Sequence, residues 1–297
     1  MGPLWVNDSW KMINLFLKFK MHKNISSQVR KQDIVESKKI LFSIFTRYGD
    51  TVIDLLVIKE FIDKFPEKKY LVLCPRQMQP YVNELLPDIE YIALNKRNLF
   101  DMFKINRKLK KWQPDIGFNP WSSGLDSCYF LTYCKKYFCY KDFNRPKIIN
   151  HYQVVRRYFI LPERDWKIDK LILKKDYQKI LICPQSTDQD RGISSIQLDK
   201  LIFDLNIKYH NPKITIASMD KSNFRNDYNQ FLFKKTVKSS RDFISLVKDS
   251  ELVICSDSGP LHIASALNKD LIAIFKSTNP EIVVKSESKL KIKKMSL

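Results

Sequence analysis

Short apolar runs alternate with longer amphipathic segments along most of the chain. In the first half, this pattern predicts buried strands at residues 40–45, 70–74, 89–94 and 116–119, and helices at 50–65, 77–86, 99–112 and from Gly124 onward. Strands that alternate with helices are typical of parallel β-α-β units. The first half therefore predicts an α/β domain built on a parallel sheet.

The same alternation returns in the second half. It predicts strands at 179–183, 214–218, 252–255 and 271–275, and helices at 195–209, 240–248 and 259–267. Residues 141–178, between the two halves, are polar and basic and contain Pro146 and Pro162, so we place a domain junction there. The predicted organisation is an N-terminal extension at 1–37, a domain at 38–160 and a domain at 161–297, with a frayed lysine-rich tail from Lys285.

The composition supports two folded domains and excludes two common kinds of phosphate-binding loop. The chain has 297 residues, of which 44% are hydrophobic, and this length suits two domains of about 150 residues. Only 6 residues are glycine, and neither GxGxxG nor the Walker pattern GxxxxGK followed by Ser or Thr occurs. A glycine-rich dinucleotide-binding domain and a Walker-type NTPase are therefore excluded.

The chain is strongly basic, with a net charge of +20. Such a charge favours anionic partners, among them nucleic acid, acidic lipid headgroups and phosphorylated glycolipids. Aromatic and lysine side chains are interleaved in the extension at 1–37, which suits a helix on an anionic membrane or a helix packed on the protein body. Two further basic clusters suit either lipid phosphates or a solvated surface. They are Lys104, Arg107, Lys108, Lys110 and Lys111, and Lys135, Lys136, Lys141, Arg145 and Lys147.

The cysteine pattern indicates a reducing compartment. The six cysteines form no CxxC pair, and we interpret them as buried free thiols; they are Cys74, Cys128, Cys134, Cys139, Cys183 and Cys255. No run of 18 uncharged apolar residues occurs, and Asp8, Lys11 and Lys18 interrupt any signal-peptide pattern. We therefore expect a cytoplasmic protein.

Three polar clusters follow predicted strands, where open α/β sheets bind their ligands. In the first cluster, Arg47–Thr51, Gly49 permits a tight turn and Asp50 opens the next helix. Asp50 is then either a helix cap or a functional carboxylate.

In the second cluster, Pro184–Gly192, a polar loop with Arg191 leads into a helix and suits a diphosphate. The same loop contains Asp188-x-Asp190, which resembles a metal-binding DxD motif and is more simply explained as a solvated loop.

The third cluster joins a buried strand to a helix of small residues, Ser256–Leu267. The amides of the first helical turn and the hydroxyl of Ser258 predict an anion site there. Pro260 stands where a first-turn proline is tolerated. His262, near the helix start, is either a structural side chain or part of the same site.

The third cluster closely resembles the signature of the lipopolysaccharide heptosyltransferase family, glycosyltransferase family 9. The likeness consists of Asp257–Leu267 followed by Ile272–Phe275 and Thr278-x-Pro280, and Gly49-Asp50 matches the family's N-terminal Gly-Asp. Pro184 and Ser186 stand where the family has its polar loop. The resemblance extends over about residues 40–283.

The resemblance implies a GT-B fold, in which two Rossmann-like domains with parallel sheets face each other across a cleft. It implies a metal-independent, inverting glycosyltransferase with no cofactor beyond its nucleotide-sugar donor, commonly ADP-heptose. The implied acceptor is a lipid A–core glycolipid, which would make the enzyme peripheral at the inner face of the cytoplasmic membrane, with no nucleic acid partner.

The resemblance also assigns roles to single residues. Asp50 would be the general base on the acceptor-side turn, which includes Gly49 and Thr51. The donor diphosphate would be bound by Ser186, Arg191, Asp257, Ser258, Gly259, Pro260 and His262, with Arg191 at the position of a family lysine.

The sequence departs from the family pattern at two places in the donor-binding half. The family's Lys-Trp is Arg191-Gly192 in this chain, and its Gly-Pro-Thr is Lys276-Ser277-Thr278. Two alternatives to an active transferase follow from the sequence. One is a non-catalytic relative that binds glycolipid or a partner enzyme. The other is a nucleic-acid-binding protein, which charge alone suggests and which no zinc-finger, RNP or KH motif supports.

Overall fold

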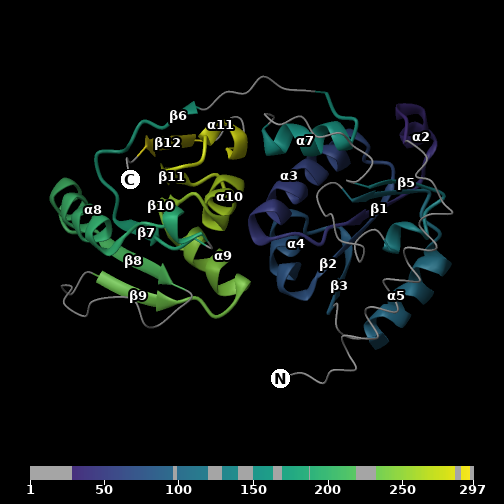
Figure 1. Cartoon of the computed structure of the whole chain (residues 1–297), viewed down its shortest axis with the longest axis horizontal. Coiled ribbons are helices and arrows are strands. Elements are labelled where there is room, and N and C mark those ends of the chain that lie inside the picture. The colour runs from purple at the N-terminus through teal and green to yellow at the C-terminus, as the bar shows by residue number, and fades with distance from the viewer. Residues whose placement is uncertain are drawn as a thin grey trace. The chain divides into compact units, whose positions relative to one another are not determined.

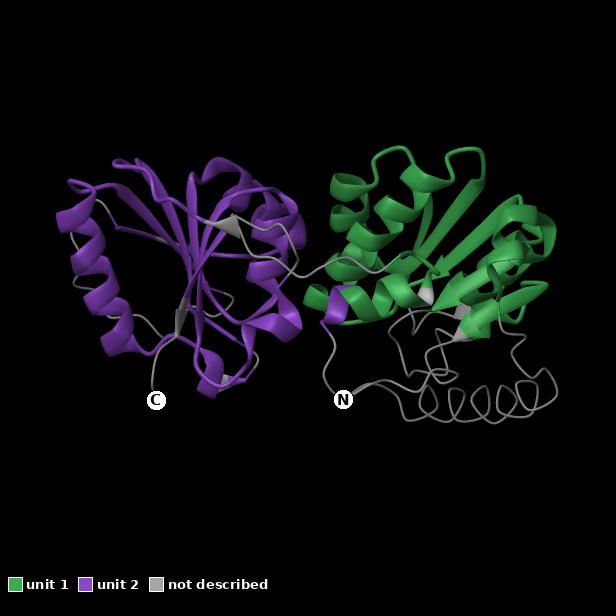
Figure 2. Cartoon of the chain, turned by 90° about the horizontal axis from the view of Figure 1, so that it is seen from above, with its two compact units in different colours: residues 1–147, 153–163 green, residues 148–152, 164–297 purple. Residues whose placement is uncertain are grey.

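The computed structural model describes residues 29–95, 99–119, 129–139, 150–162, 169–186, 188–218, 232–284 and 289–294. The chain divides into two compact units, one of residues 1–147 and 153–163 and the other of residues 148–152 and 164–297 (Figure 2). Each unit is built on one parallel sheet (Figure 1). The predicted α/β fold class is confirmed. Residues 1–28 of the predicted extension lie outside the described residues.

Unit 1 holds a five-stranded parallel sheet in the order β3-β2-β1-β4-β5. The strands are β1 (Lys39–Ser43), β2 (Lys69–Pro75), β3 (Glu90–Leu94), β4 (Ile116–Asn119) and β5 (Lys136–Cys139). The helices are α2 (Lys31–Glu36), α3 (Tyr48–Lys64), η1 (Arg76–Met78), α4 (Gln79–Leu85), α5 (Leu99–Trp112) and most of α7 (His151–Tyr158). The strand order reverses between β1 and β4, so a topological switch point lies between them.

The interior of unit 1 is rich in aromatic rings. Phe42 of β1 is fully buried, and its ring centroid lies 5.8 Å from that of Phe61, 5.9 Å from that of Phe118 and 5.2 Å from that of Phe159. These rings come from β1, α3, β4 and the segment that follows α7. The strand, the helix and the returning segment are therefore joined in one core, which fixes the C-terminal part of α3, where Phe61 lies, relative to the sheet.

Unit 2 holds a seven-stranded parallel sheet in the order β6-β12-β11-β10-β7-β8-β9. The strands are β6 (Asp169–Lys170), β7 (Lys179–Cys183), β8 (Lys213–Ser218), β9 (Leu232–Thr236), β10 (Leu252–Ser256), β11 (Asp270–Phe275) and β12 (Lys289–Lys294). The helices are η3 (Gln189–Arg191), α8 (Ser195–Lys208), α9 (Ser240–Asp249), α10 (Gly259–Ala266) and α11 (Pro280–Val283). The switch point of this sheet lies between β7 and β10.

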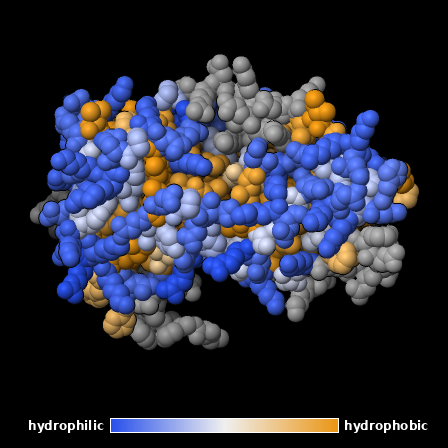
Figure 3. Space-filling model, turned by 180° about the vertical axis from the view of Figure 1, so that it is seen from behind, coloured by the Kyte–Doolittle hydropathy of each residue, from blue (hydrophilic) through white to orange (hydrophobic). Residues whose placement is uncertain are grey.

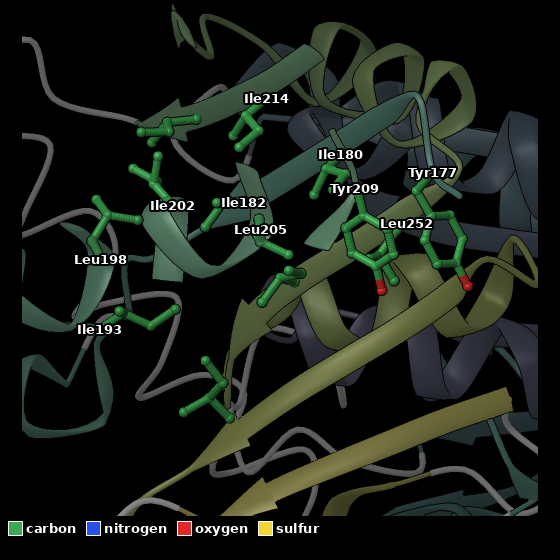
Figure 4. Packing of buried hydrophobic residues seen from close by; sticks show 13 residues of the cluster. Tyr177, Ile180, Ile182, Ile193, Leu198, Ile202, Leu205, Tyr209, Ile214 and Leu252 are labelled. Carbon is green, nitrogen blue, oxygen red and sulfur yellow. The ribbon is translucent and has the colours of Figure 1, made fainter. Parts of the chain in front are cut away.

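Isoleucine and leucine side chains fill the space between α8 and the sheet of unit 2 (Figure 4). At one end of this cluster the rings of Tyr177 and Tyr209 meet edge to face, with centroids 5.2 Å apart. The hydroxyl of Tyr177 donates to Asp270 over 2.8 Å, so this buried phenol is satisfied at the start of β11. The polar loops that follow the strands lie at the opposite edge of the sheet, where the strands have their carboxyl ends.

Several sequence predictions need correction. The tail predicted to fray from Lys285 forms β12 over Lys289–Lys294, because it pairs with β11 along its length. The segment placed at the domain junction contains α7 and β6, and β5 and β9 were not anticipated. Gly124, where a further helix was expected to begin, lies outside the described residues.

The free-thiol interpretation is confirmed for Cys74, Cys183 and Cys255, which are buried and unbridged. Cys134 is also free but only half-buried. Burial raises the pKa of Cys74 and of Cys183 to about 12, so neither thiol ionises readily at neutral pH. Cys128 lies outside the described residues.

The described surface is mainly hydrophilic in the view from behind, with hydrophobic side chains visible in patches between the polar ones (Figure 3). Among the helices that the structure describes, none combines the length and the apolar character needed to cross a bilayer.

Candidate functional site

The polar loops after β7 and β10 meet at the switch point of unit 2. Ser256, the last residue of β10, donates its hydroxyl to the carbonyl of Gln185 over 3.2 Å. Ser186 donates in the other direction, to the carbonyl of Asp257 over 3.4 Å. The two predicted clusters, far apart in sequence, are thus joined by reciprocal hydrogen bonds at the place where open α/β sheets bind their ligands.

Arg191 is held over this point by two carboxylates. It ends the short helix η3, and its Nη1 lies 3.2 Å from Oδ2 of Asp257 while its Nε lies 3.3 Å from Oδ2 of Asp188. The Asp257 side chain is 5% exposed and that of Arg191 is 28% exposed. A guanidinium in this position presents its remaining N–H groups to an anion that enters the switch point.

The Asp188 side chain is 53% exposed and its contact with Arg191 lies within the same loop, which is compatible with the interpretation as a solvated loop. Among the described residues, no group of three His, Cys, Asp or Glu side chains is placed to hold a metal ion.

The start of α10 differs from the starts of its neighbours. Ser258 is the N-cap residue, but its hydroxyl turns back to Ser256, lying 3.2 Å from Oγ and 3.3 Å from the carbonyl oxygen of that residue. Within the described residues, α10 has no side-chain cap, whereas α8, α9 and α11 are capped by Ser194, Ser239 and Asn279. The amides of the first turn of α10 are thus left for an external anion.

Gly259 and Pro260 stand at the first two positions of α10, where the sequence placed them. Proline is tolerated there because a first-turn amide needs no partner within the helix.

His262 is buried, and it is fixed by residues that sequence reasoning did not identify. Its Nδ1 lies 3.3 Å from the hydroxyl of Tyr152. Asn150 fixes that part of the chain: its amide nitrogen donates to the carbonyls of Glu281 and Val284, and its oxygen accepts from the backbone of Tyr152. Burial lowers the pKa of His262 to about 4, with Asp257 opposing that shift. The imidazole is therefore neutral at physiological pH.

Lys276 is a second cation at the same edge, and the sequence marked it only as a departure from the family pattern. It follows β11 directly, and its Nζ donates to the carbonyl of Gly192 over 2.5 Å. Gly192 is the residue after Arg191. Lys276 therefore ties the loop that positions Arg191 to the end of β11.

The first cluster lies at the switch point of unit 1, after β1, and two details of its prediction are wrong. The helix α3 begins at Tyr48, so Gly49 lies inside its first turn, and no described glycine has a left-handed backbone. Asp50 is the third helical residue, and the N-cap is Arg47, so Asp50 is not a helix cap. Thr51 is buried, with its hydroxyl 2.8 Å from that of Thr46, which holds the entry to the helix.

One helical turn beyond Asp50 lies a carboxyl group that the sequence did not single out. Asp54 is fully buried, and neither of its oxygens has a hydrogen-bond partner among the described residues. Burial raises its pKa well above the usual value, and the charge of Asp50 raises it further. Burial therefore favours the protonated form of Asp54.

Residues 239–292 match the model of glycosyltransferase family 9 (heptosyltransferase). No curated protein matches the chain by sequence.

Solved structures share the fold at low identity. The E. coli heptosyltransferase WaaC with ADP is 11% identical, with a TM-score of 0.65 over 86% of this chain and 93% of that one. The E. coli ADP-heptose lps heptosyltransferase II is 15% identical, with a TM-score of 0.66 over 86% and 89%. A family 9 glycosyl transferase from Veillonella parvula is 13% identical, with a TM-score of 0.64 over 87% and 86%.

The matched segment 239–292 contains α10, and the fold likeness extends over both units. Residues 239–292 are thus similar to family 9 of the glycosyltransferases, the heptosyltransferases, and both units share the GT-B fold of solved heptosyltransferases.

Proposed function

We propose that the chain transfers heptose from ADP-heptose to a lipopolysaccharide-core acceptor. The observation that carries the proposal is the anion-binding edge of unit 2, where Arg191 and the first turn of α10, which no described side chain caps, meet at the switch point. A diphosphate fits this combination of a guanidinium and a helix N-terminus. Solved neighbours bind ADP and ADP-2-deoxy-2-fluoro heptose, which favours an ADP-sugar as the donor.

In this proposal the donor diphosphate lies on the start of α10. Arg191 and the helix amides stabilise the charge that develops on the leaving ADP, and no metal is needed for that step. Asp257 holds the guanidinium in place, and the neutral His262 offers its second ring nitrogen to the donor. These groups stabilise negative charge where it forms during the reaction.

Asp50 acts as the general base. Its carboxylate removes the proton from an acceptor hydroxyl as the oxygen attacks the anomeric carbon on the face opposite the diphosphate, so the configuration inverts. Burial favours the neutral form of Asp54, which limits the negative charge beside Asp50. The acceptor is a lipid-linked glycan, which makes the enzyme peripheral at the inner face of the cytoplasmic membrane.

A panel of nucleotides tests the donor assignment. The thermal unfolding midpoint is measured with ADP, UDP, GDP and CMP and with their sugar conjugates. A ligand at 100 times its Kd stabilises the fold by about 2.7 kcal/mol, which is readily measured. We expect a rise with ADP and ADP-heptose alone. A rise restricted to UDP or GDP compounds would overturn the heptose donor, and no rise with any nucleotide would favour a non-catalytic family member.

A further inference from the structure

We propose that the exposed face of α5 binds an anionic lipid bilayer. The inference rests on the proposed function only for the membrane-borne acceptor that would bring the chain to a bilayer. The surface itself is argued from its own residues, all of which lie in unit 1.

The two sides of α5 differ sharply. Met102, Ile105 and Leu109 are buried against the sheet of unit 1, and at about 100° per residue they lie on one side of the helix. The other side presents Phe100 and Phe103, whose side chains are 78% and 71% exposed. Two phenylalanines one turn apart form an apolar patch that is unfavourable in water and favourable at a lipid interface.

Basic side chains share that exposed side. By the same helical spacing, Lys104, Arg107 and Lys111 lie within about 60° of Phe100, and Lys108 and Lys110 flank them. The single acidic residue of the helix is Asp101, which lies 3.5 Å from Nη2 of Arg76. An aromatic patch framed by Lys and Arg matches the negative surface and apolar interior of an acidic bilayer.

A shallow depression continues the basic surface beside the helix. It is lined by Arg76, Tyr91, Ile92, Lys104 and Lys108, among others, with the Lys108 amine 2.5 Å from Glu90. Glu90 and Asp101 neutralise Lys108 and Arg76, so Lys104 is the cation that this depression offers to a lipid phosphate. The depression would therefore hold one headgroup while the aromatic pair enters the interface.

Helix α8 of unit 2 provides an internal control. It also has 14 residues and exposes large apolar side chains, with Ile196 at 80%, Phe203 at 65% and Ile207 at 63%. Its Lys200 and Lys208 are balanced by Asp199 and Asp204. Both helices thus expose apolar side chains. Of the two, only α5 surrounds them with an excess of basic side chains.

Vesicle flotation of the full chain tests the proposal. Vesicles of phosphatidylcholine alone are compared with vesicles that contain about one third phosphatidylglycerol. We expect binding to the acidic vesicles only. The change Phe100→Ser with Phe103→Ser should lower the partition coefficient at least tenfold. The change Lys104→Gln, Arg107→Gln and Lys111→Gln should lower it about a hundredfold, at about fivefold for each basic residue near the surface. The control Phe203→Ser with Ile207→Ser should bind like the wild type.

A fluorescence arm locates the contact. In acidic vesicles with brominated acyl chains, Phe103→Trp should be quenched well beyond the wild-type background, and Phe203→Trp should not.

The proposal is overturned if the wild type fails to bind acidic vesicles, or if the α5 variants bind them as well as the control does. ADP binding is measured on the same samples without vesicles. ADP binding by a wild type that does not bind vesicles would contradict this surface and leave the proposed donor site intact. Circular dichroism and the thermal unfolding midpoint show whether each α5 variant folds.

Discussion

The two switch points of this chain use one topology for opposite charges. In unit 1, the helix after β1 brings Asp50 and, one turn later, the buried Asp54. In unit 2, the loops after β7 and β11 bring Arg191 and Lys276, and α10 brings its N-terminus. The first edge suits removal of a proton, and the second suits a polyanion. The fold thus gives the place, and a few side chains at each place give the chemistry.

Of the changes that distinguish the two edges, replacement of Asp50 should have the largest effect on sugar transfer. The change Asp50→Asn keeps the shape and removes the base, so we expect sugar transfer to fall by about 10²–10⁴-fold. ADP affinity should stay within about twofold of the wild-type value, because the residues proposed to bind the diphosphate lie in unit 2. The exposed Asp63 on the same helix is the matched control, and Asp63→Asn should leave transfer unchanged in a radiolabelled-sugar assay. Near-normal transfer by Asp50→Asn would show that Asp50 is not the general base.

His262 should give unit 2 a stability that declines in acid. Its pKa is about 4 in the folded chain, below its usual value of 6.5. Between these two values the unfolded chain binds a proton that the folded chain does not, so the free energy of unfolding falls as pH falls from about 6.5 to 4. The loss is roughly 3 kcal/mol at 1.36 kcal/mol per pKa unit. Urea titrations of wild type and His262→Gln across this range measure it. Equal pH slopes for the two proteins would contradict the assignment.

Lys276 should matter to donor affinity through the loop that it ties down. The change Lys276→Met removes the hydrogen bond to Gly192, and we expect ADP to bind about tenfold more weakly. Lys269 makes a similar contact at the opposite end of β11, where its Nζ donates to the carbonyls of Lys248 and Ser250. Lys269→Met should lower the unfolding midpoint but leave ADP affinity unchanged in calorimetric titrations. Equal losses of affinity in the two variants would mean that Lys276 acts only on stability.

Asp54 should give unit 1 the opposite pH dependence of stability. Replacing Asp54 by Asn should change the free energy of unfolding by less than the changes above. Because its pKa is raised in the folded chain, folding holds a proton that the unfolded chain releases above about pH 4. Stability therefore falls as pH rises toward the folded pKa. Asp54→Asn removes this slope and should be more stable than wild type at pH 7, although its amide is still buried without a partner. Thermal unfolding of both proteins at pH 4, 5.5 and 7 measures the difference, and equal pH slopes for the two proteins would contradict the raised pKa of Asp54.

The sequence predicted the main elements of both sheets because their apolar runs are short and bounded by polar loops. It placed Asp50, Arg191 and Asp257 at strand ends, and the structure joins the last two directly. It could not predict β12, whose lysines resemble a frayed tail until β11 provides a partner. Nor could it find the contact of Tyr152 with His262, because the two residues are 110 positions apart and Tyr152 lies in the irregular junction.

Local composition misled the prediction at the first cluster. Gly49 and Asp50 resemble a turn and a cap, but α3 begins at Tyr48, one residue before the glycine. A helical position for Asp50 is compatible with either a structural or a catalytic carboxylate. The burial of Asp54 one turn away, which distinguishes the two carboxyl groups, depends on the tertiary structure and is not visible in the sequence.

The most direct test of the account is the preference for a diphosphate at the switch point of unit 2. Calorimetric titrations compare ADP with AMP in the wild type and in Arg191→Met. We expect the wild type to bind ADP ten- to a hundredfold more tightly than AMP, since charge-assisted hydrogen bonds contribute about 1.5–3 kcal/mol each. The variant should lose most of that preference. Equal affinities for ADP and AMP in the wild type, or an undiminished preference in Arg191→Met, would contradict the assignment of this edge as the donor site.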